Sequence, residues 1–247
     1  MTQRIPKKLR NDAIVEALCE TRFKCGELSE IVVGRLSDFR PWHPVRLPVA
    51  DIPEALRAMD ANLKYQPIVE LRDPEGVQRI RIGGNVLSFH LTGEEKYCGW
   101  EIFAPQLEEL FRYLFERLTE VSIFRAGFRY INALTFEKHH ISSVNDLNLN
   151  IEVGDATLSG PVNLNYQVTN DVSHITMTRI ASPVFVQGEL PRNTTAVVDI
   201  DVTSPDGLEI QSVSQASEWA RVAHGYEKQA FFSLIPEAIL SKVVEEW

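Results

Sequence analysis

The sequence contains little cysteine. Its 247 residues include three cysteines, Cys19, Cys25 and Cys98, which form no CxxC pair, and the odd number leaves one of them without a partner. This pattern excludes the disulfide framework of a small secreted domain, because such a framework needs several paired cysteines at regular spacings. Reduced thiols are the simplest interpretation, so we expect a cytoplasmic protein.

Long apolar runs are absent as well. No segment approaches the stretch of roughly 20 apolar residues that a membrane-spanning helix needs. The N-terminal segment 1–12 is basic, with Lys7 and Lys8 among its charges, and no apolar run of the signal-peptide type follows it. We therefore expect a basic N-terminal tail over residues 1–12 and no membrane partner.

The sequence also lacks the motifs of common catalytic and cofactor-binding sites. It has no GxxxxGK[ST] phosphate loop, no GxGxxG turn, no GxSxG nucleophile turn and no HExxH metal motif. The pair His139-His140 is the nearest approach to a metal or acid–base signal. The side chains of two consecutive residues in a helix or strand cannot point toward the same ligand, so two exposed histidines in a loop are the simpler interpretation. The sequence thus predicts no catalytic residue, no metal site and no cofactor, and it favours a protein without enzymatic activity.

Positive charge is in short supply. Lysine and arginine together number 25, aspartate and glutamate 34, and the formal net charge is −9. A protein that binds nucleic acid over its whole surface needs an excess of positive charge, because the affinity rests largely on neutralising phosphates. The composition argues against such a protein and leaves a local basic patch open.

What the sequence does contain is a long two-faced strand at its midpoint, residues 121–136. Successive side chains of a strand point to opposite faces. One face carries an aromatic and apolar set, which consists of Phe124, Ala126, Phe128, Tyr130, Asn132, Leu134 and Phe136. The other face carries Ile123, Arg125, Gly127, Arg129, Ile131, Ala133 and Thr135. We expect helices to cover the aromatic face and the arginine face to meet water or acids.

Around this strand the chain divides into two consecutive α+β halves, residues 13–119 and 120–247. Each half reads as a strand, a meander of strands and a closing helix. The first closing helix is predicted over 105–118, with Pro105 in its first turn, and a long helix after Ser212 closes the second half. Because strands follow one another without helices between them, the order predicts an α+β fold with a largely antiparallel sheet backed by long helices.

Four charged residues are the first candidates for binding. Asp199 and Asp201 lie about 7 Å apart on one face of a predicted strand, and Arg125 and Arg129 share a face of the central strand. A charge ladder between the two strands would contribute about 0.2–1 kcal/mol per pair. A binding surface made from the same residues is the alternative, and a magnesium site would need further oxygen ligands that the sequence does not locate.

Asn132 and His224 are the remaining candidates. Asn132 interrupts an apolar face, where an unpaired amide would cost about 1–3 kcal/mol, so we expect it to bond to the backbone of a neighbouring helix or loop, with a ligand contact as the second interpretation. His224 lies on the apolar side of the closing helix and is expected to be half-buried with a partner; a pH or ligand role is the alternative. A small-molecule site between the sheet and this helix is a third hypothesis.

Three stretches resemble a sporadically distributed family of uncharacterised prokaryotic proteins of about this length. They are a PIVEALCE-like start at Ala13–Phe23, a GxRYIN strand at Gly127–Asn132 and a closing AHxxxxxxFxxLI helix at Ala223–Ile235. The chain departs from the family by having Ala13 where the family has proline. No activity is established for that family, so the resemblance carries over no catalytic residue. Its patchy distribution is similar to that of phage-defence and toxin–antitoxin genes.

These observations lead to two functional hypotheses. The first is a non-enzymatic cytoplasmic protein that binds a partner protein, as a component of a prokaryotic defence or toxin–antitoxin system, with self-association into a homo-oligomer as one form of binding. The second is a nucleic-acid or nucleotide binder, including a nuclease, that uses Arg125, Arg129 and His139-His140 as a local basic face. A continuous basic groove over these residues would favour the second hypothesis, and an ion-paired face would favour the first.

Overall fold

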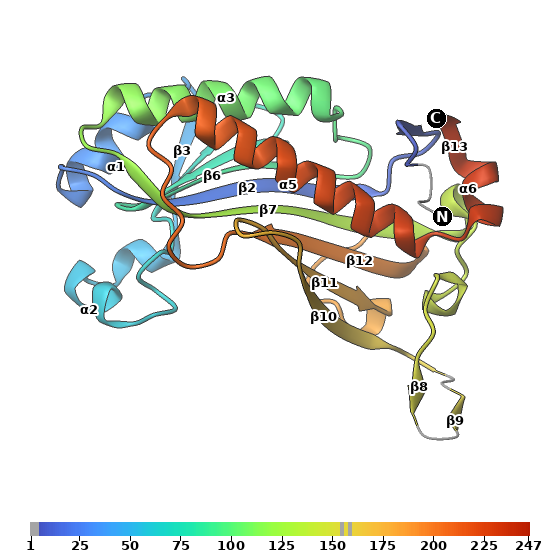
Figure 1. The fold of residues 1–247 in the computed structure, drawn as a ribbon. Helices are drawn as coiled ribbons and strands as arrows, with labels where there is room; N and C mark the ends of the chain where they lie inside the picture. Colours follow the sequence, from blue (N-terminus) through green and yellow to red (C-terminus); the bar gives the residue numbers. More distant parts are fainter. Residues whose placement is uncertain (1–4, 154–155, 158–159) are drawn as a thin grey trace.

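A nine-stranded antiparallel sheet runs through the whole molecule (Figure 1). The computed structural model describes residues 5–153, 156–157 and 160–247. In spatial order the strands are β10 (Asn163–Thr169), β11 (Ile175–Ala181), β12 (Thr194–Thr203), β7 (Ser122–Thr135), β2 (Ile14–Lys24), β6 (Val86–Thr92), β5 (Gln78–Ile82), β4 (Val69–Arg72) and β3 (His43–Arg46). All neighbouring pairs are antiparallel.

Two long helices, α3 (Trp100–Arg117) and α5 (Val213–Leu234), pack side by side on one face of this sheet (Figure 1). We call this the inner face and the opposite side the outer face. The other helical segments are short: α1 (Ser29–Ser37), η1 (Pro48–Asp51), α2 (Glu54–Met59), α4 (Phe136–His139), η2 (Val144–Asp146), η3 (Pro183–Phe185) and α6 (Glu237–Val243). Within the described ranges, no helix has both the length and the apolar character needed to cross a bilayer.

Apart from the edge strand β3, which has no counterpart, the two sides of the sheet have the same order when read outward from the central pair. β2 and β7 pair at the centre, followed on one side by β6, β5 and β4 and on the other by β12, β11 and β10. Each meander leads into one long helix, α3 after the first and α5 after the second. The predicted α+β fold, with strand, meander and helix twice in succession and an antiparallel sheet backed by long helices, is confirmed.

The two ends of the chain meet beside one another (Figure 1). β1 (Lys8–Leu9) pairs with β13 (Val244–Glu246) in a small separate sheet. The Lys7 ammonium lies 2.9 Å from the Glu246 carboxylate, so part of the basic segment 1–12 is held against the acidic C-terminal segment. A second small hairpin, β8 (Glu152–Val153) with β9 (Ala156–Thr157), lies at the lower right of Figure 1.

The central strand β7 is two-faced, as its alternation predicts. Phe128 and Tyr130 are 0% and 1% exposed, whereas Arg125 is exposed and Arg129 is half-buried on the opposite face. Phe128 packs edge-on against Trp100 and Phe103 of α3. The aromatic side of the strand therefore forms the contact between the sheet and its helices.

One end of β7 departs from the predicted alternation because of a β-bulge. The pairing with β2 changes register between Arg22 and Phe23, so that Arg22 faces Arg125 while Phe23 faces Ile123. The extra residue, Phe124, points to the outer face against Tyr65, and Ile123 is fully buried instead. The predicted faces of Ile123 and Phe124 were therefore wrong, since a bulge inserts one unpaired residue and resets the period of two.

Helix α3 begins at Trp100, earlier than the predicted start at residue 105. Gly99 precedes the helix with a φ of 86°, in the left-handed region that glycine adopts without strain. Pro105 consequently lies inside the helix and not in its first turn. The predicted apolar stripe is correct, since Leu107, Leu110, Phe111 and Leu114 are buried.

Candidate functional site

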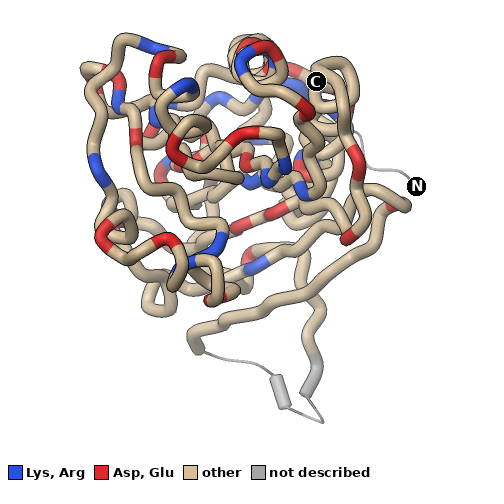
Figure 2. The backbone as a smooth tube through the Cα atoms, turned by 90° about the vertical axis from the view of Figure 1, so that its left-hand side faces the viewer, with Lys and Arg blue, Asp and Glu red and all other residues tan. Residues whose placement is uncertain are grey.

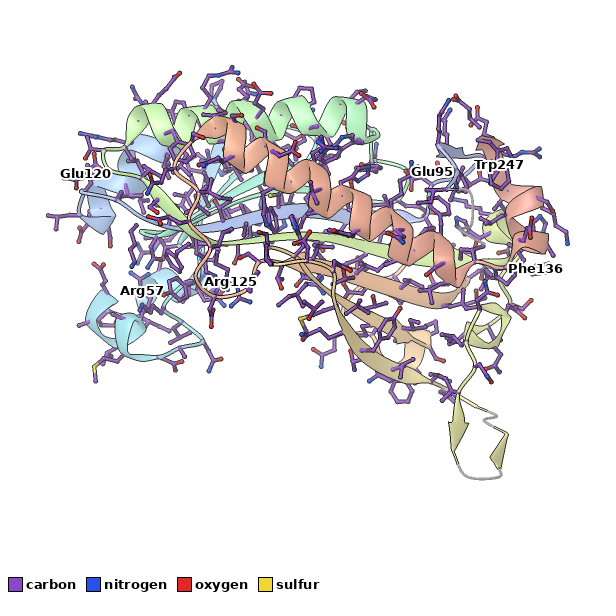
Figure 3. All side chains as sticks on the ribbon, in the orientation of Figure 1. Arg57, Glu95, Glu120, Arg125, Phe136 and Trp247 are labelled. Atoms are coloured by element: carbon purple, nitrogen blue, oxygen red, sulfur yellow. The ribbon has the colours of Figure 1, made fainter. Side chains whose placement is uncertain are left out.

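The structure divides the predicted binding residues between the two sides of the sheet. Four lie on the outer face: Arg125, Arg129, Asp199 and Asp201. Two lie on the inner side: Asn132 in β7 and His224 in α5. Figure 3 labels Arg125 on the side of the sheet away from α3 and α5. The first four residues therefore belong to one surface, and the last two belong to the protein interior.

A row of polar side chains, interrupted by Leu18, crosses the outer face. The pairing registers place the following residues opposite one another in successive strands: Asp201, Arg129, Leu18, His90, Arg79 and Arg72. Directly opposite residues share one face of a sheet with their Cβ atoms about 4.5–5.5 Å apart. The row thus joins strands from both halves of the chain, from β12 to β4, into one charged surface.

A bidentate ion pair on this surface joins Arg129 to Asp199. The Arg129 Nε and Nη2 atoms donate to the two Asp199 carboxylate oxygens at 2.7 Å and 2.6 Å. The Asp199 side chain is 13% exposed and that of Arg129 is 38% exposed. The hydrogen bonds to Asp199 raise the pKa of Arg129 above its already high usual value. The predicted pairing of β7 arginines with β12 aspartates is confirmed for this pair.

The second predicted pair does not form. Arg125 is exposed, and it makes no ion pair among the residues that the structure describes. Asp201 is half-buried, and burial raises its pKa to about 6, while Arg129 opposes the rise and Asp199 adds to it. Asp201 therefore gains a proton near pH 6, and the charge of exposed Arg125 also opposes the rise in its pKa without forming an ion pair.

The other half of the outer face carries its own ion pairs. Glu70 is 1% exposed and accepts hydrogen bonds from Arg81 at 2.7 Å and from Arg72. Burial by itself would raise the pKa of Glu70, but these two bonds lower it below the usual value. Glu16 bonds to His90 Nδ1 at 3.1 Å, and this bond lowers the pKa of Glu16. Several outer-face arginines are thus paired with acids, whereas Arg79 lies opposite Arg72 and Arg125 lies opposite Arg22 in the strand register.

A pocket of about 390 Å³ opens on the outer face beside η3. Its walls are the side chains of β7, β11 and β12 and the segment after η3, namely Arg129, Ile131, Arg179, Ala181, Phe185, Val186, Gln187, Val197 and Asp199. The guanidinium of Arg179 donates to Asn163 Oδ1 at 3.0 Å and to the Phe185 carbonyl at 2.7 Å. Two predicted residues, Arg129 and Asp199, therefore line a cavity that is large enough for a small group.

On the inner side, His224 belongs to an aromatic network. Its Nδ1 lies 3.2 Å from the Tyr130 hydroxyl, which in turn lies 2.5 Å from the Tyr97 hydroxyl. The imidazole stacks on Trp100 with ring centres 4.2 Å apart. Burial lowers the pKa of His224 to about 4, so the ring is neutral at pH 7. The predicted half-buried histidine with a partner is present.

The Asn132 side chain forms hydrogen bonds to two neighbouring residues. Its Nδ2 donates to the Val198 carbonyl at 3.1 Å, so the predicted backbone partner exists but belongs to strand β12 and not to a helix or loop. Asn132 also bonds to Glu227 of α5, which is 3% exposed. Burial raises the pKa of Glu227 well above its usual range, and nearby Asp12 adds to the rise. Burial therefore favours the protonated form of Glu227.

Sequence reasoning missed Glu227 and Tyr97. The signal for Glu227 was its spacing, because Ala223, Glu227 and Phe231 follow one another at intervals of four on the buried stripe of α5. A charged residue on such a stripe needs a partner in the interior. Nothing in the local sequence marks Tyr97, which reaches the network from the loop before α3.

The histidine pair at 139 and 140 does not form a site. His139 is 4% exposed, and its Nδ1 accepts a hydrogen bond from the Thr135 amide at 3.0 Å. Burial lowers the pKa of His139 to about 4, whereas His140 is exposed and has a φ of 55°. The expectation of two exposed loop histidines was wrong for His139. Among the described residues, no group of three or more histidine, cysteine or acidic side chains could hold a metal ion.

Comparison of the chain with protein-family models and with curated proteins finds no match. The resemblance at Ala13–Phe23, Gly127–Asn132 and Ala223–Ile235 therefore stays a sequence-based interpretation.

Proposed function

We propose that this chain is a non-enzymatic protein that binds a partner protein through its outer face. The observation that carries the proposal is a set of fixed arginine–carboxylate pairs on a sheet face that no long helix covers in the described part of the chain (Figure 1). Such a surface selects a partner by charge pattern, because like charges brought together at an interface cost several kcal/mol. The fixed pairs also keep the arginine side chains ordered before binding, which reduces the entropy lost on association.

The distribution of charge supports a protein partner over a polyanion. Arg129, Arg72 and Arg81 are each bonded to a carboxylate, so they offer little free charge to a phosphate backbone. Figure 2 shows lysine and arginine interspersed with aspartate and glutamate, without a large region of one sign. The chain as a whole has a net charge of −9. A partner surface with both signs of charge matches this pattern better than nucleic acid does.

Charge reversal at an exposed position of the outer face tests the proposal. The wild-type chain captures its partner from lysate of the native host, mass spectrometry identifies it, and the purified partner is then titrated by calorimetry. We expect Arg125→Glu to weaken binding at least tenfold. Arg112→Glu on the exposed side of α3 is the matched control and leaves the affinity unchanged. Equal affinity of the Arg125→Glu variant and the wild type would refute the use of this face.

The partner protein in this proposal can also be a second copy of the same chain. Light scattering of the purified chain over a range of concentrations measures its oligomeric state. A dimer that dissociates on Arg125→Glu substitution places the self-contact on the outer face.

Nucleic acid is the second candidate partner, and one observation favours it. Arg79, Arg125 and Arg179 have no carboxylate partner among the described residues. Fluorescence anisotropy with labelled single-stranded and double-stranded RNA and DNA tests this candidate. Binding that weakens steeply between 50 and 200 mM salt, on the order of the 10³-fold loss that several phosphate contacts produce, would replace the protein-binding proposal with this one.

The cellular setting is part of the proposal. The three free cysteines, Cys19, Cys25 and Cys98, support a reducing compartment such as the cytoplasm. A role in a defence or toxin–antitoxin system rests on the family resemblance of the sequence alone. The identity of the captured protein tests it, since a toxin or an anti-phage component is expected.

A further inference from the structure

The pocket beside η3 has one uncompensated positive charge. Both carboxylate oxygens of Asp199 are bonded to Arg129, so these two residues together are neutral. Arg179 also lines the pocket, and its two bonded acceptors, the Asn163 amide oxygen and the Phe185 carbonyl, are both uncharged. The pocket therefore presents a net charge of one guanidinium group.

The guanidinium of Arg179 is held in place and still has donors to offer. Its Nε bonds to Asn163 and its Nη2 to Phe185, which fixes the plane of the group. An arginine side chain has five N–H donors, and these two contacts use two of them. A fork of N–H groups with fixed orientation suits a carboxylate, which accepts two parallel hydrogen bonds.

About half of the pocket wall is apolar. Ile131, Ala181 and Val197 form part of the lining, and Phe185 stands at 44% exposure beside them. The volume of about 390 Å³ falls within the range of about 300–1,000 Å³ that small-molecule sites occupy. The combination of one fixed cation with apolar walls matches a ligand that has an anionic end and an apolar body.

We propose that the η3 pocket binds a monocarboxylate attached to an apolar group. The carboxylate bonds to the free N–H groups of Arg179, and the apolar group packs on Phe185 and Val197. A phosphate dianion fits less well, because a single uncompensated charge cannot balance it and the Asp199 carboxylate lines the same pocket. This inference deepens the proposed function and rests on it in part, since the C-terminal carboxylate of a partner protein has this chemistry, as does a free carboxylic acid.

Phenylacetate is the first probe, because it joins one carboxylate to one apolar ring. Titration into the purified full chain, followed by two-dimensional NMR, measures the binding constant and the location of the shifts. We expect saturable binding in the millimolar range with shifts at Phe185 and Ala181. Phenylacetamide, which is neutral, and inorganic phosphate are each expected to bind at least tenfold more weakly. Equal binding of phenylacetamide, or tighter binding of phosphate, would overturn the proposal.

Two substitutions locate the site. Arg179→Gln removes the cation and should weaken phenylacetate binding at least tenfold. Gln187 lies exposed at the pocket wall, so Gln187→Glu adds a repelling charge with little risk to folding and should weaken binding severalfold. Arg112→Gln on α3 is the matched control and should bind as the wild type does. If the folded Gln187→Glu and Arg179→Gln variants both bind phenylacetate as the wild type does, phenylacetate binds elsewhere and the proposal is refuted.

A peptide distinguishes the two sources of the carboxylate. Gly-Gly-Phe with a free C-terminus is compared with the same peptide carrying a C-terminal amide. Tighter binding of the free peptide than of phenylacetate assigns the pocket to a protein C-terminus, and the reverse order assigns it to a free carboxylic acid. These measurements need no partner, so a failure of partner capture and a failure of the pocket are separate results.

Discussion

The inner face of the sheet packs against α3 and α5, whereas the outer face carries no long helix in the described part of the chain. The pKa values of a buried carboxyl group on each side are shifted in opposite directions. Glu227 on the inner side and Glu70 on the outer face have little exposed surface, 3% and 1%, but Glu227 lies deep in the core, whereas Glu70 lies near the surface beneath two partly exposed arginines. The pKa of Glu227 is raised by burial, while arginine hydrogen bonds lower the pKa of Glu70 despite its burial. The surroundings of Glu227 favour its protonated form, and those of Glu70 favour its charged form.

The difference shows that partners, and not burial alone, decide the charge of an interior acid. Glu70 has two guanidinium groups within hydrogen-bonding distance, which stabilise its charged form. Glu227 has the Asn132 amide as its bonding partner and the Asp12 carboxyl group nearby, and the charge of Lys228 offsets only part of the effect of burial on its pKa. The inner face therefore acts as a neutral core, and the outer face keeps its charges for recognition.

The largest expected loss of stability distinguishes a substitution on the inner face of strand β7 from one on its outer face. Phe128→Ala removes a fully buried ring that contacts Trp100 and Tyr130, and we expect a loss of about 3–5 kcal/mol in the free energy of unfolding. Phe124→Ala on the same strand removes a half-exposed ring on the outer face and should cost about 0.5–1.5 kcal/mol. Urea unfolding of both variants measures this, and equal losses would contradict the bulge that turns Phe124 outward.

A loss of intermediate size is expected at the buried outer-face acid. Glu70→Gln leaves Arg72 and Arg81 without their anionic acceptor, and hydrogen bonds to charged groups contribute about 1.5–3 kcal/mol. Because the pKa of Glu70 is lowered in the folded state, its stabilisation is present above the unfolded value of about 4.5 and is lost as the pH falls through the folded value. Unfolding curves at pH 7 and pH 3 test this, and a loss that grows toward pH 3 would contradict it.

The neutral acid of the inner face should behave in the opposite way. The raised pKa of Glu227 means that the folded state keeps a proton that the unfolded state has released, so stability falls as the pH rises, by at most about 1.4 kcal/mol per pH unit. Glu227→Gln should flatten this slope and match or exceed the wild type at pH 8.5. Exposed Glu237→Gln on α6 is the control and should leave the slope unchanged.

The measurement for Glu227 is best made between pH 6.5 and 8.5. His139 and His224 have pKa values of about 4 in the folded state, so they reduce stability as the pH falls below about 6.5, where the unfolded histidines gain protons. They contribute little above that pH. An unchanged slope in Glu227→Gln within this window would show that Glu227 is charged in the folded protein.

The smallest effect is expected at the solvent-exposed pair of α3. Arg112 and Glu108 lie 2.6 Å apart at a spacing of four residues, with side chains that are about half exposed. Arg112→Ala should lower the free energy of unfolding by no more than about 0.3–0.5 kcal/mol, and high salt should remove most of that loss. Thermal unfolding with and without 1 M salt measures it. A loss as large as that of Glu70→Gln would mean that burial does not determine how much an ion pair contributes to the stability of this protein.

Much of the fold could be predicted from the periodicity of the sequence. The alternation at 121–136 predicted a two-faced strand, and the apolar spacing at 107–114 predicted the buried stripe of α3. The bulge at Phe124 could not be predicted, because a bulge is set by pairing with β2, which lies about a hundred residues earlier in the chain. The start of α3 was also missed, since Pro105 resembles a first-turn proline when only its neighbours are considered.

The sequence by itself determined which residues could be charged, which strand would have two faces and that helices would cover the aromatic side. These properties follow from side-chain chemistry and a period of two or of 3.6 residues. Only the tertiary structure decided that Arg129 bonds to Asp199 and that Arg125 stays exposed. It also decided that the pKa of Glu227 is raised while that of Glu70 is lowered, and that Arg179 lines a pocket without a carboxylate hydrogen-bond partner among the described residues. The physical reason is that burial and charge partners come from residues far apart in the chain, which meet only when the register of the sheet is set.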